Sequence, residues 1–363
     1  MLTLTLLLSL LTPPRDTLKA VSLFPFPIVY YTPETRLAYG AVLSATFRFR
    51  RDQALLRADS LPPGHPDRPR PSNVQLLGAY TQNKQILLFV PFQVFYDRNR
   101  YYIYGEAGYY RYNYNFYGLG QREVPAENYG VDYPRIRVNA LRRIRPHLYA
   151  GLRYEYENYQ ITKTEPGGLL ASGTVPGGLG GRMAGGGLGL FYDTRDNVFY
   201  PRLGVVADLS YLGHGAALGS DFRYNRYVAD VASYHKLSQR AILALNYVVS
   251  ITGGGGTAPF SALSLLGGGK RMRGYYEGRY RDQNLALLQA EGRFHIWKRL
   301  SATAFGAVGW LGDAQTLIRV SDPKVAGGVG LRVRINNDGQ HIRVDYGFGR
   351  QSSGLYLTLG EAF

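Results

Sequence analysis

The sequence contains no cysteine, and it is also poor in methionine and tryptophan. Among its 363 residues there are 3 Met and 2 Trp. Without cysteine the chain has no disulfide scaffold, no thiolate zinc site and no cysteine nucleophile. Stability and function must therefore come from other residue types.

Long apolar runs are missing as well. A helix that crosses a membrane needs about 20 consecutive, mostly apolar residues, and no such run occurs. Long amphipathic helical periods are also absent, although 45% of the residues are hydrophobic and the mean hydropathy is −0.20. The apolar residues lie in alternating blocks of roughly ten, separated by turn residues, which is typical of a membrane barrel. We therefore predict an all-β protein, a transmembrane antiparallel β-barrel of the bacterial outer-membrane type.

Acidic residues are scarce relative to basic ones. The chain has 42 Lys and Arg against 26 Asp and Glu, a net charge of +16. The basic residues are spread over turns, such as 142–145 and 297–299, and no nucleic-acid-binding motif collects them. We expect the partners to be outer-membrane lipids and lipopolysaccharide, whose phosphates are anionic, and not nucleic acid.

The first residues divide into two segments before the predicted barrel. Residues 1–20 begin with an apolar run of signal-peptide length and are interpreted as a probable signal peptide, although the usual preceding positive charges are missing; a first buried strand is the alternative. Residues 21–36 contain three prolines, which cannot donate hydrogen bonds inside a sheet. We predict a periplasmic lead-in or plug segment there, and a barrel over 37–363.

Alternation is clearest near the end of the chain. Val329 and Leu331 fall on one face of a predicted strand and Arg332 on the other, and in the next strand Arg343 and Asp345 oppose apolar residues. An arginine on the lipid face near the midplane costs roughly 2–4 kcal/mol. The apolar faces should therefore point to lipid and the charges to a wet lumen.

The last strand carries a terminal signal. Apolar residues alternate with small or polar ones and the chain ends on an aromatic residue, as is typical of bacterial outer-membrane barrels. These residues are Leu355, Leu357, Leu359 and Phe363. We predict about 16 strands, an even number, starting with a strand near 37–50 and including one near 118–124 that the even number requires. Tyrosines of a strand at 101–114 are interpreted as an interfacial girdle.

One glycine-rich basic loop interrupts the barrel pattern between residues 252 and 283. It contains Arg273, Gly274 and Tyr275. Glycine accepts positive φ and permits a tight bend after the arginine, and an arginine withdrawn from water needs an acid partner. We predict that this loop folds into the barrel and is held there through Arg273. Contact of Arg273 with solvent or lumen carbonyls alone is the alternative.

Other site chemistry finds little support. The segment that ends in Gly269-Lys270 is not a phosphate loop, because no serine or threonine follows Lys270 and Ser264 stands where the first glycine should be. The 6 histidines show no metal-ligand spacing. No serine lies in a strained elbow. We expect no enzyme activity, no cofactor and no metal.

Three stretches together resemble one family. Residues 271–275 match its arginine-glycine-aromatic loop motif, residues 192–204 resemble the turn before its middle strands, and the third stretch is the carboxy-terminal strand. From about Thr35 to Phe363 the chain resembles the BamA/TamA-like outer-membrane protein superfamily, also called the bacterial surface antigen family. Members usually carry POTRA domains ahead of the barrel, so the chain resembles a barrel-only branch that lacks them.

The resemblance implies both a salt bridge and a role. In the family the motif arginine pairs with acids on strands after the loop, and Glu291 stands where the first is expected; a second would fall within 304–309, which has none. The implied role is outer-membrane biogenesis: protein insertion or translocation, or lipid handling, through a seam between the strands at 37–47 and 355–363. Unfolded outer-membrane proteins or periplasmic proteins are the implied partners. A passive pore or a structural barrel is the alternative.

Overall fold

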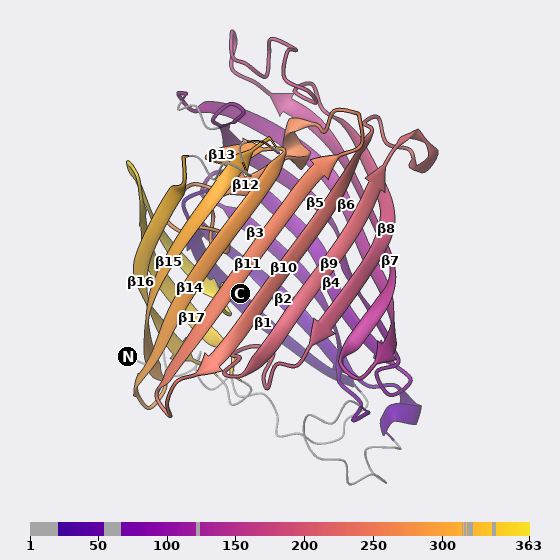
Figure 1. Ribbon diagram of the computed structural model, residues 1–363, viewed down its shortest axis with the longest axis vertical. Helices are drawn as coiled ribbons and strands as arrows, with labels where there is room; N and C mark the ends of the chain where they lie inside the picture. Colours follow the sequence, from indigo (N-terminus) through magenta and orange to yellow (C-terminus); the bar gives the residue numbers. More distant parts are fainter. Residues whose placement is uncertain are drawn as a thin grey trace.

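The computed structural model describes residues 21–53, 67–120, 124–313, 315, 317, 322–335 and 339–363. The predicted signal peptide, residues 1–20, lies outside these residues. Sixteen antiparallel strands close into a barrel, and a two-stranded sheet, β12–β13, is separate from it (Figure 1). No helix in the described part of the chain is long and apolar enough to span a membrane. The predicted fold class and the even strand number are confirmed.

The barrel strands follow one another around the wall in chain order. They are β1 (Val21–Thr32), β2 (Arg36–Phe47), β3 (Ser72–Thr81), β4 (Ile86–Tyr96), β5 (Tyr101–Phe116), β6 (Glu127–Arg145), β7 (Leu148–Lys163), β8 (Gly181–Asp193), β9 (Gly204–His214), β10 (Tyr224–Lys236), β11 (Ala241–Gly253), β14 (Asn284–Trp297), β15 (Leu300–Gly312), β16 (Lys324–Arg334), β17 (His341–Gly349) and β18 (Ser352–Leu359). Two short 3-10 helices, η1 (Ala216–Leu218) and η2 (Phe260–Ala262), lie in loops, and β12 (Ser264–Leu266) pairs with β13 (Tyr280–Asp282).

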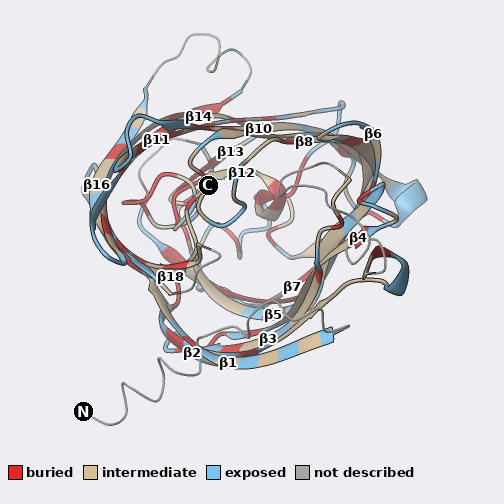
Figure 2. Ribbon diagram, turned by 90° about the horizontal axis from the view of Figure 1, so that it is seen from below, coloured by how far each residue is buried: buried red, intermediate tan, exposed pale blue. Residues whose placement is uncertain are grey.

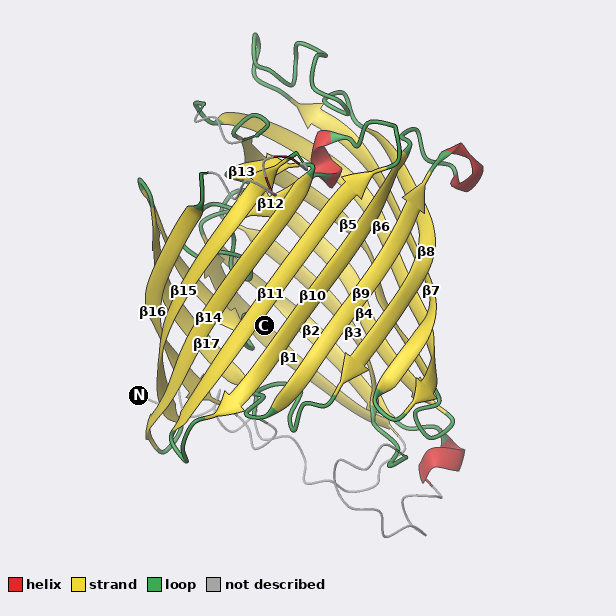
Figure 3. Cartoon of the chain, viewed as in Figure 1, coloured by secondary structure: helices red, strands yellow, loops and turns green. Residues whose placement is uncertain are grey.

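The two ends of the barrel differ. Because the strand number is even, β1 begins and β18 ends at the same end, which we call the terminal end; the opposite end, which holds the segment between β11 and β14, we call the loop end (Figure 3). The alternation of apolar and charged residues along a strand, predicted from sequence, is confirmed in β16: Val329 and Leu331 are 58% and 47% exposed, whereas Arg332 is 0% exposed. The apolar residues face outward, and the charged ones face the interior of the barrel.

Residues 21–36 are not a lead-in or plug, as predicted, but the first strand and its turn. All twelve residues of β1 pair with β2, although Pro25 and Pro27 lie within the strand. The prediction failed because proline is excluded only from strands that need ladder bonds on both sides. Strand β1 pairs with β18 at one position alone, Tyr31 with Leu357. Its other edge is open, so missing N–H groups cost little there.

Two other strand interpretations were also wrong. No described residue of 118–124 belongs to a strand. Gly120 makes only an isolated bridge to Arg281 of β13. The count of 16 survives because β1 replaces that strand. Most tyrosines of β5 do not form an interfacial girdle but stack inside the barrel. Tyr112 and Tyr114 lie 4.6 Å apart between ring centroids.

The chain end turns inward instead of completing the last strand. Strand β18 stops at Leu359, and Gly360 adopts the left-handed conformation at φ 78°. Leu355 and Leu359 are exposed outward as predicted, but Phe363 packs inside against Ala232, Tyr234 and Ala244. The C-terminus accordingly lies within the ring of strands in Figure 2. A period of two identifies a strand face but says nothing of a bend at a positive-φ glycine.

The outward face makes a quantitative prediction. Val329→Arg places a cation on the exposed apolar face of β16, and it should lower the free energy of unfolding by about 2–4 kcal/mol if the position lies near the bilayer midplane. Ser210→Arg, which puts the same charge into the lumen beside Asp208, should cost less than about 1 kcal/mol. Urea titration of the barrel folded in lipid vesicles measures both. Equal losses for the two variants would contradict a lipid-facing β16 surface.

Candidate functional site

The segment between β11 and β14 folds into the barrel and crosses it. Its sheet β12–β13 lies inside the ring of strands when the barrel is viewed along its axis (Figure 2). The turn between β12 and β13 carries Arg273, Gly274 and Tyr275. We call residues 254–283 the inner loop. Three separate contacts attach it to the wall, and each uses a different kind of interaction.

The first contact is an ion-paired arginine. Arg273 is 1% exposed. Its Nη2 donates to Glu291 Oε2 on β14 at 2.7 Å, and its Nη1 donates to Asp345 Oδ2 on β17. The guanidinium also lies over the ring of Phe305 on β15, 3.7 Å from the centroid. Arg273 therefore connects the loop to three strands of one wall.

Two further arginines and one acid extend this pair into a cluster. Arg293 Nε donates to Glu291 Oε1 at 2.8 Å. Arg332 donates to Glu291, to Asp345 and, through Nε at 2.8 Å, to Glu361 Oε2 in the inward-turned C-terminal residues. We call the set of three arginines and three acids the buried charge cluster; its members are Arg273, Arg293, Arg332, Glu291, Asp345 and Glu361.

The buried charge cluster is balanced, which its burial requires. The charges of these six residues sum to zero, and the side chains of Arg273, Arg293, Arg332, Glu291 and Asp345 are each 1% exposed or less. Arg343 adjoins the cluster as a further buried cation: its Nε lies 3.6 Å from Asp345 Oδ2, and it donates to Thr358 Oγ1 and to the Gly269 carbonyl. Ions taken out of water are tolerable only when each is paired and hydrogen-bonded. These arginines therefore do not face a wet lumen, as we predicted from sequence, but form a dry ionic core between loop and wall.

Glycines allow the backbone of the loop to approach the wall. Gly274 has φ 119°, and a Cβ built there would lie 2.7–2.8 Å from backbone atoms of Phe348. Across the contact, a Cβ on Gly347 would lie 2.7 Å from the Arg273 carbonyl carbon. No other residue fits this backbone-to-backbone approach without displacement. The glycine after the arginine is thus needed for both the bend and the approach.

Tyrosine hydroxyls complete the same contact. Tyr356 Oη on β18 accepts the Gly274 N–H and donates to the Tyr275 carbonyl, each at 3.1 Å. Tyr275 Oη accepts the Arg350 N–H at 2.7 Å and donates to the Val325 carbonyl at 3.0 Å. The arginine-glycine-tyrosine turn therefore has its backbone and its ring satisfied by β16, β18 and the turn between β17 and β18.

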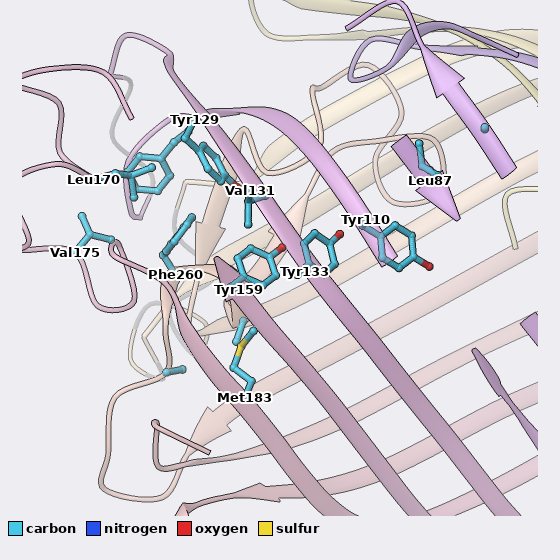
Figure 4. Packing of buried hydrophobic residues seen from close by; sticks show 14 of the residues in the cluster. Leu87, Tyr110, Tyr129, Val131, Tyr133, Tyr159, Leu170, Val175, Met183 and Phe260 are labelled. Atoms are coloured by element: carbon cyan, nitrogen blue, oxygen red, sulfur yellow. The ribbon is translucent and has the colours of Figure 1, made fainter. Parts of the chain in front are cut away.

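The second contact is apolar and lies on the opposite wall. Phe260 of η2 is fully buried among residues of β6, β7, β8 and the loop after β7 (Figure 4). Its ring stands edge-on to Phe116 and Tyr129, with centroids 5.4 and 5.6 Å away. Leu170 and Val175 close the cluster from the loop after β7. The inner loop therefore packs against the wall opposite the buried charge cluster.

The third contact joins the inner loop to the β1–β2 turn. The Glu277 N–H donates to Glu34 Oε1 at 2.7 Å, and the Glu34 carbonyl accepts amide groups of Asn83 and Gln85. Glu34 is 4% exposed, and this burial raises the pKa of its carboxyl. The hairpin that holds β1 is thereby attached to the same loop that Arg273 holds to β14 and β17.

The barrel closes weakly at one place. Strands β1 and β18 share a single residue pair, Tyr31 with Leu357, whereas β17 and β18 pair along the whole of β18. We call the β1–β18 junction the seam. Backbone groups at an open strand edge are free to pair with another chain. The seam therefore lies between two elements that the inner loop touches, at Glu34 and at Tyr356.

Sequence reasoning found part of this site. It named Arg273, Gly274, Tyr275 and Glu291, and the structure brings all four to one contact. The second acid expected within 304–309 is supplied instead by Asp345, two strands further on, while Phe305 occupies the expected strand. The alternation of β17 placed Asp345 inward, and this was the available signal. Arg293 had the same signal, because it lies two residues after Glu291 on β14 and so shares its face. Glu361 had none, because its role depends on the inward bend at Gly360.

Comparison with known proteins assigns the family. Residues 90–363 match the Omp85 superfamily domain. The chain belongs to the Omp85 superfamily. No curated protein matches its sequence. The described residues, 21–53 and 67 onward with the gaps given above, contain the barrel and its loops and no POTRA domain.

Solved structures of this Omp85 barrel's relatives share its fold at low sequence identity. BamA from Haemophilus ducreyi lacking POTRA domains 1–3 is 13% identical with a TM-score of 0.60; the match covers 94% of this chain and 70% of that one. CdiB from Acinetobacter baumannii is also 13% identical at a TM-score of 0.60, with 94% and 60% covered. CdiB from Escherichia coli is 11% identical at 0.56, with 93% and 62% covered. This Omp85 protein thus spans less than two thirds of either CdiB chain.

The ionic contact of the Omp85 barrel leads to a stability prediction. Arg273→Ala removes one partner from Glu291 and Asp345, and because Arg332 still pairs with both, we expect a loss of about 3 kcal/mol, the lower end for a broken buried pair. Urea titration of the folded barrel gives the value. Arg223→Ala, an exposed arginine of the loop before β10, should change it by less than about 0.5 kcal/mol. A loss as small for Arg273→Ala would show that the pair does not hold the loop.

Proposed function

We propose that this Omp85 barrel resides in the bacterial outer membrane, with the terminal end toward the periplasm, and inserts or translocates polypeptides through its seam. Short turns are periplasmic and longer loops extracellular in such barrels. Here the inner loop and the loops after β5, β7 and β15 are at the loop end, whereas the terminal end has mostly short turns and one longer connection, residues 48–71. The observation that carries the proposal is the seam, where one residue pair replaces a ladder.

The physical reason is the low cost of opening. A backbone hydrogen bond contributes a net 0.5–1.5 kcal/mol, roughly, so parting β1 from β18 costs far less than parting β1 from β2. The open β1 edge presents unpaired backbone groups, which are a template for an incoming strand. A client strand adding to this edge would be paired by β-augmentation, in which main-chain bonds supply affinity without requiring a fixed sequence.

The inner loop supports this function more than a pore function. It holds the β1–β2 turn through Glu34 and contacts β18 through Tyr356, so it positions both strands of the seam. A loop with three wall contacts also occupies the lumen, and we expect low ion conductance. These contacts therefore favour a function at the seam in the barrel wall over ion passage through the lumen.

A passive pore or structural barrel is the second candidate, favoured by one observation. A cavity of about 800 Å³ lies between the inner loop and the wall of β5 to β10, lined by tyrosines and by charged residues such as Arg226 and Asp230. If this space were continuous with solvent at both ends, ions would pass. Single-channel conductance in planar bilayers separates the two candidates, because a pore requires a steady open level and the proposed seam does not.

The decisive test locks the seam. Because the chain has no cysteine, Tyr31→Cys with Leu357→Cys places the only two thiols at opposed positions, as disulfide geometry requires. We expect wild-type protein in liposomes to accelerate the folding of a second, unfolded barrel protein, the oxidised double variant to lose this acceleration, and reduction to restore it. The folding rate, followed by gel mobility of the folded form, is the measurement.

Matched variants make the result specific. Val333→Cys with Ile342→Cys joins two fully paired strands, β16 and β17, and its oxidation should leave the acceleration unchanged. Arg273→Ala, if still folded, should lose acceleration because the loop no longer positions the seam. Absence of acceleration by the wild type would refute insertion and leave the pore and structural roles. Equal inhibition by both disulfides would show that the seam is not the working element.

A further inference from the structure

A second cavity lies at the terminal end, away from the inner loop. Its volume is about 510 Å³. It is lined by the loop between β8 and β9, by the turns after β10 and β14, and by the ends of β16 and β17. We call it the mouth pocket. Its basic lining residues are Arg202, Arg240, Lys298, Arg299 and Arg334.

The mouth pocket belongs to the lumen and not to the lipid face. Ile242, Ser301 and His341 line it and are buried, inward-facing residues of β11, β15 and β17. The loop between β8 and β9 reaches across this end, because the Tyr200 ring stacks on His341 of β17 with centroids 4.3 Å apart. Strands β9 to β16 separate these two elements along the wall. A ligand of the mouth pocket therefore arrives from the aqueous side of the terminal end.

The charges in the mouth pocket are unbalanced. None of its five cations has a carboxylate within 4.0 Å among the described residues, in contrast to the arginines of the buried charge cluster. Asp196 is the one acid in the lining, and its Oδ1 accepts the N–H groups of Arg202 and Leu203. The described lining thus has a net charge of five minus one, or +4.

Some of these cations are held in place rather than dispersed. Arg202 Nη2 donates to the Gln239 carbonyl at 3.0 Å, and this bond joins the loop between β8 and β9 to the turn after β10. The Nε of Arg202 is buried and has no hydrogen-bond partner among the described residues. Lys298 lies over the Trp297 ring, 4.5 Å from its centroid. Like charges gathered around one cavity repel. An anionic ligand with several charges would offset this repulsion, whereas a single small anion would leave most of it.

We propose that the mouth pocket is a docking site for an acidic segment of a polypeptide, recognised by Arg202, Arg240, Lys298, Arg299 and Arg334. The identity of the ligand as polypeptide rests on the proposed function, in which protein reaches the barrel from this end. Arginine forks match carboxylates in bidentate geometry, and the charge surplus of the lining matches a short run of Asp and Glu. Complementary charge at the entrance also speeds encounter with such a segment.

The test uses the full chain in lipid nanodiscs and a fluorescent eight-residue peptide of alternating Asp and Glu. Fluorescence anisotropy gives the Kd at low and moderate salt. The pocket variant is Arg240→Gln/Arg299→Gln/Arg334→Gln, three exposed residues whose loss should not impair folding. The matched control is Arg98→Gln/Arg142→Gln/Arg145→Gln, which removes the same charge from the turn after β4 and from the end of β6, also at the terminal end. Heat-modifiable gel mobility verifies that both fold.

We expect the pocket variant to weaken peptide binding about tenfold and the control less than about twofold, with binding falling as salt rises. A peptide with Asn and Gln in place of the acids should not bind. Equal weakening by both variants, or equal binding of the neutral peptide, would overturn the proposal. So would displacement of the peptide by low-millimolar inorganic phosphate at constant ionic strength, because it would assign the pocket to a small anion.

The insertion activity at the seam and the docking site in the mouth pocket can be refuted independently of each other. The seam disulfide changes folding acceleration and leaves the mouth pocket intact, so acceleration without peptide binding refutes only the docking site. Peptide binding without acceleration by the wild type refutes only the insertion activity and leaves an acidic-segment receptor on a barrel of another role.

Discussion

The buried charge cluster is the interaction on which the architecture depends. The six ionised side chains of the cluster share one dry region with Arg343, and each acid lies within 4.0 Å of at least two arginines. Charges this deeply buried are stable only as a complete set. The requirement ties three otherwise separate parts together: the inner loop through Arg273, the wall of β14 to β17, and the C-terminal residues through Glu361. Neither the loop nor the chain end is free to leave alone without stranding a charge.

That constraint acts next to the weakest junction of the wall. Strand β1 tolerates two prolines because its outer edge needs no ladder, and β18 bends inward at Gly360 before it can pair further. An exposed strand edge is ordinarily a liability. Here the elements on both sides of the junction are held from the inside, at Glu34 and at Tyr356. The internal loop thus supports this one junction, where a single residue pair replaces the ladders that join the other strands of the barrel.

Charged side chains occur in two different arrangements inside the barrel. In the buried charge cluster every arginine has an acid within hydrogen-bonding distance, and the ensemble is neutral. At the terminal end none of the five cations of the mouth pocket lies within 4.0 Å of a carboxylate of a described residue, although Asp196 also lines the pocket. Neutral, dry pairs fix geometry, whereas unpaired cations facing water attract ligands. The buried charge cluster therefore stabilises the fold, whereas the cations of the mouth pocket remain available to bind an anionic ligand.

The fold followed from patterns that are local in the chain. A period of two in β16 and β17 separated Val329 from Arg332, and turn residues marked most strand ends, so the barrel was predicted from these patterns. Its even strand number followed from the general rule for such barrels, and its family from the resemblance of three short stretches. The errors have a common cause. Proline in β1, the tyrosines of β5 and the aromatic end at Phe363 were judged by residue type, but their places depend on which neighbour each strand has.

The sequence by itself determined the barrel and the inward loop, because the alternation of side chains and a glycine after an arginine are local features; Glu291 as the first acid partner of Arg273 followed from the resemblance to the family and from the need to pair a buried charge. Only the tertiary structure decided that Asp345 and Glu361 complete the cluster, that β1 and β18 meet at one pair, and that five cations from three turns and the end of β16 surround one cavity. Each of these facts joins residues tens to hundreds of positions apart. Ring closure brings them together, and no local preference encodes it.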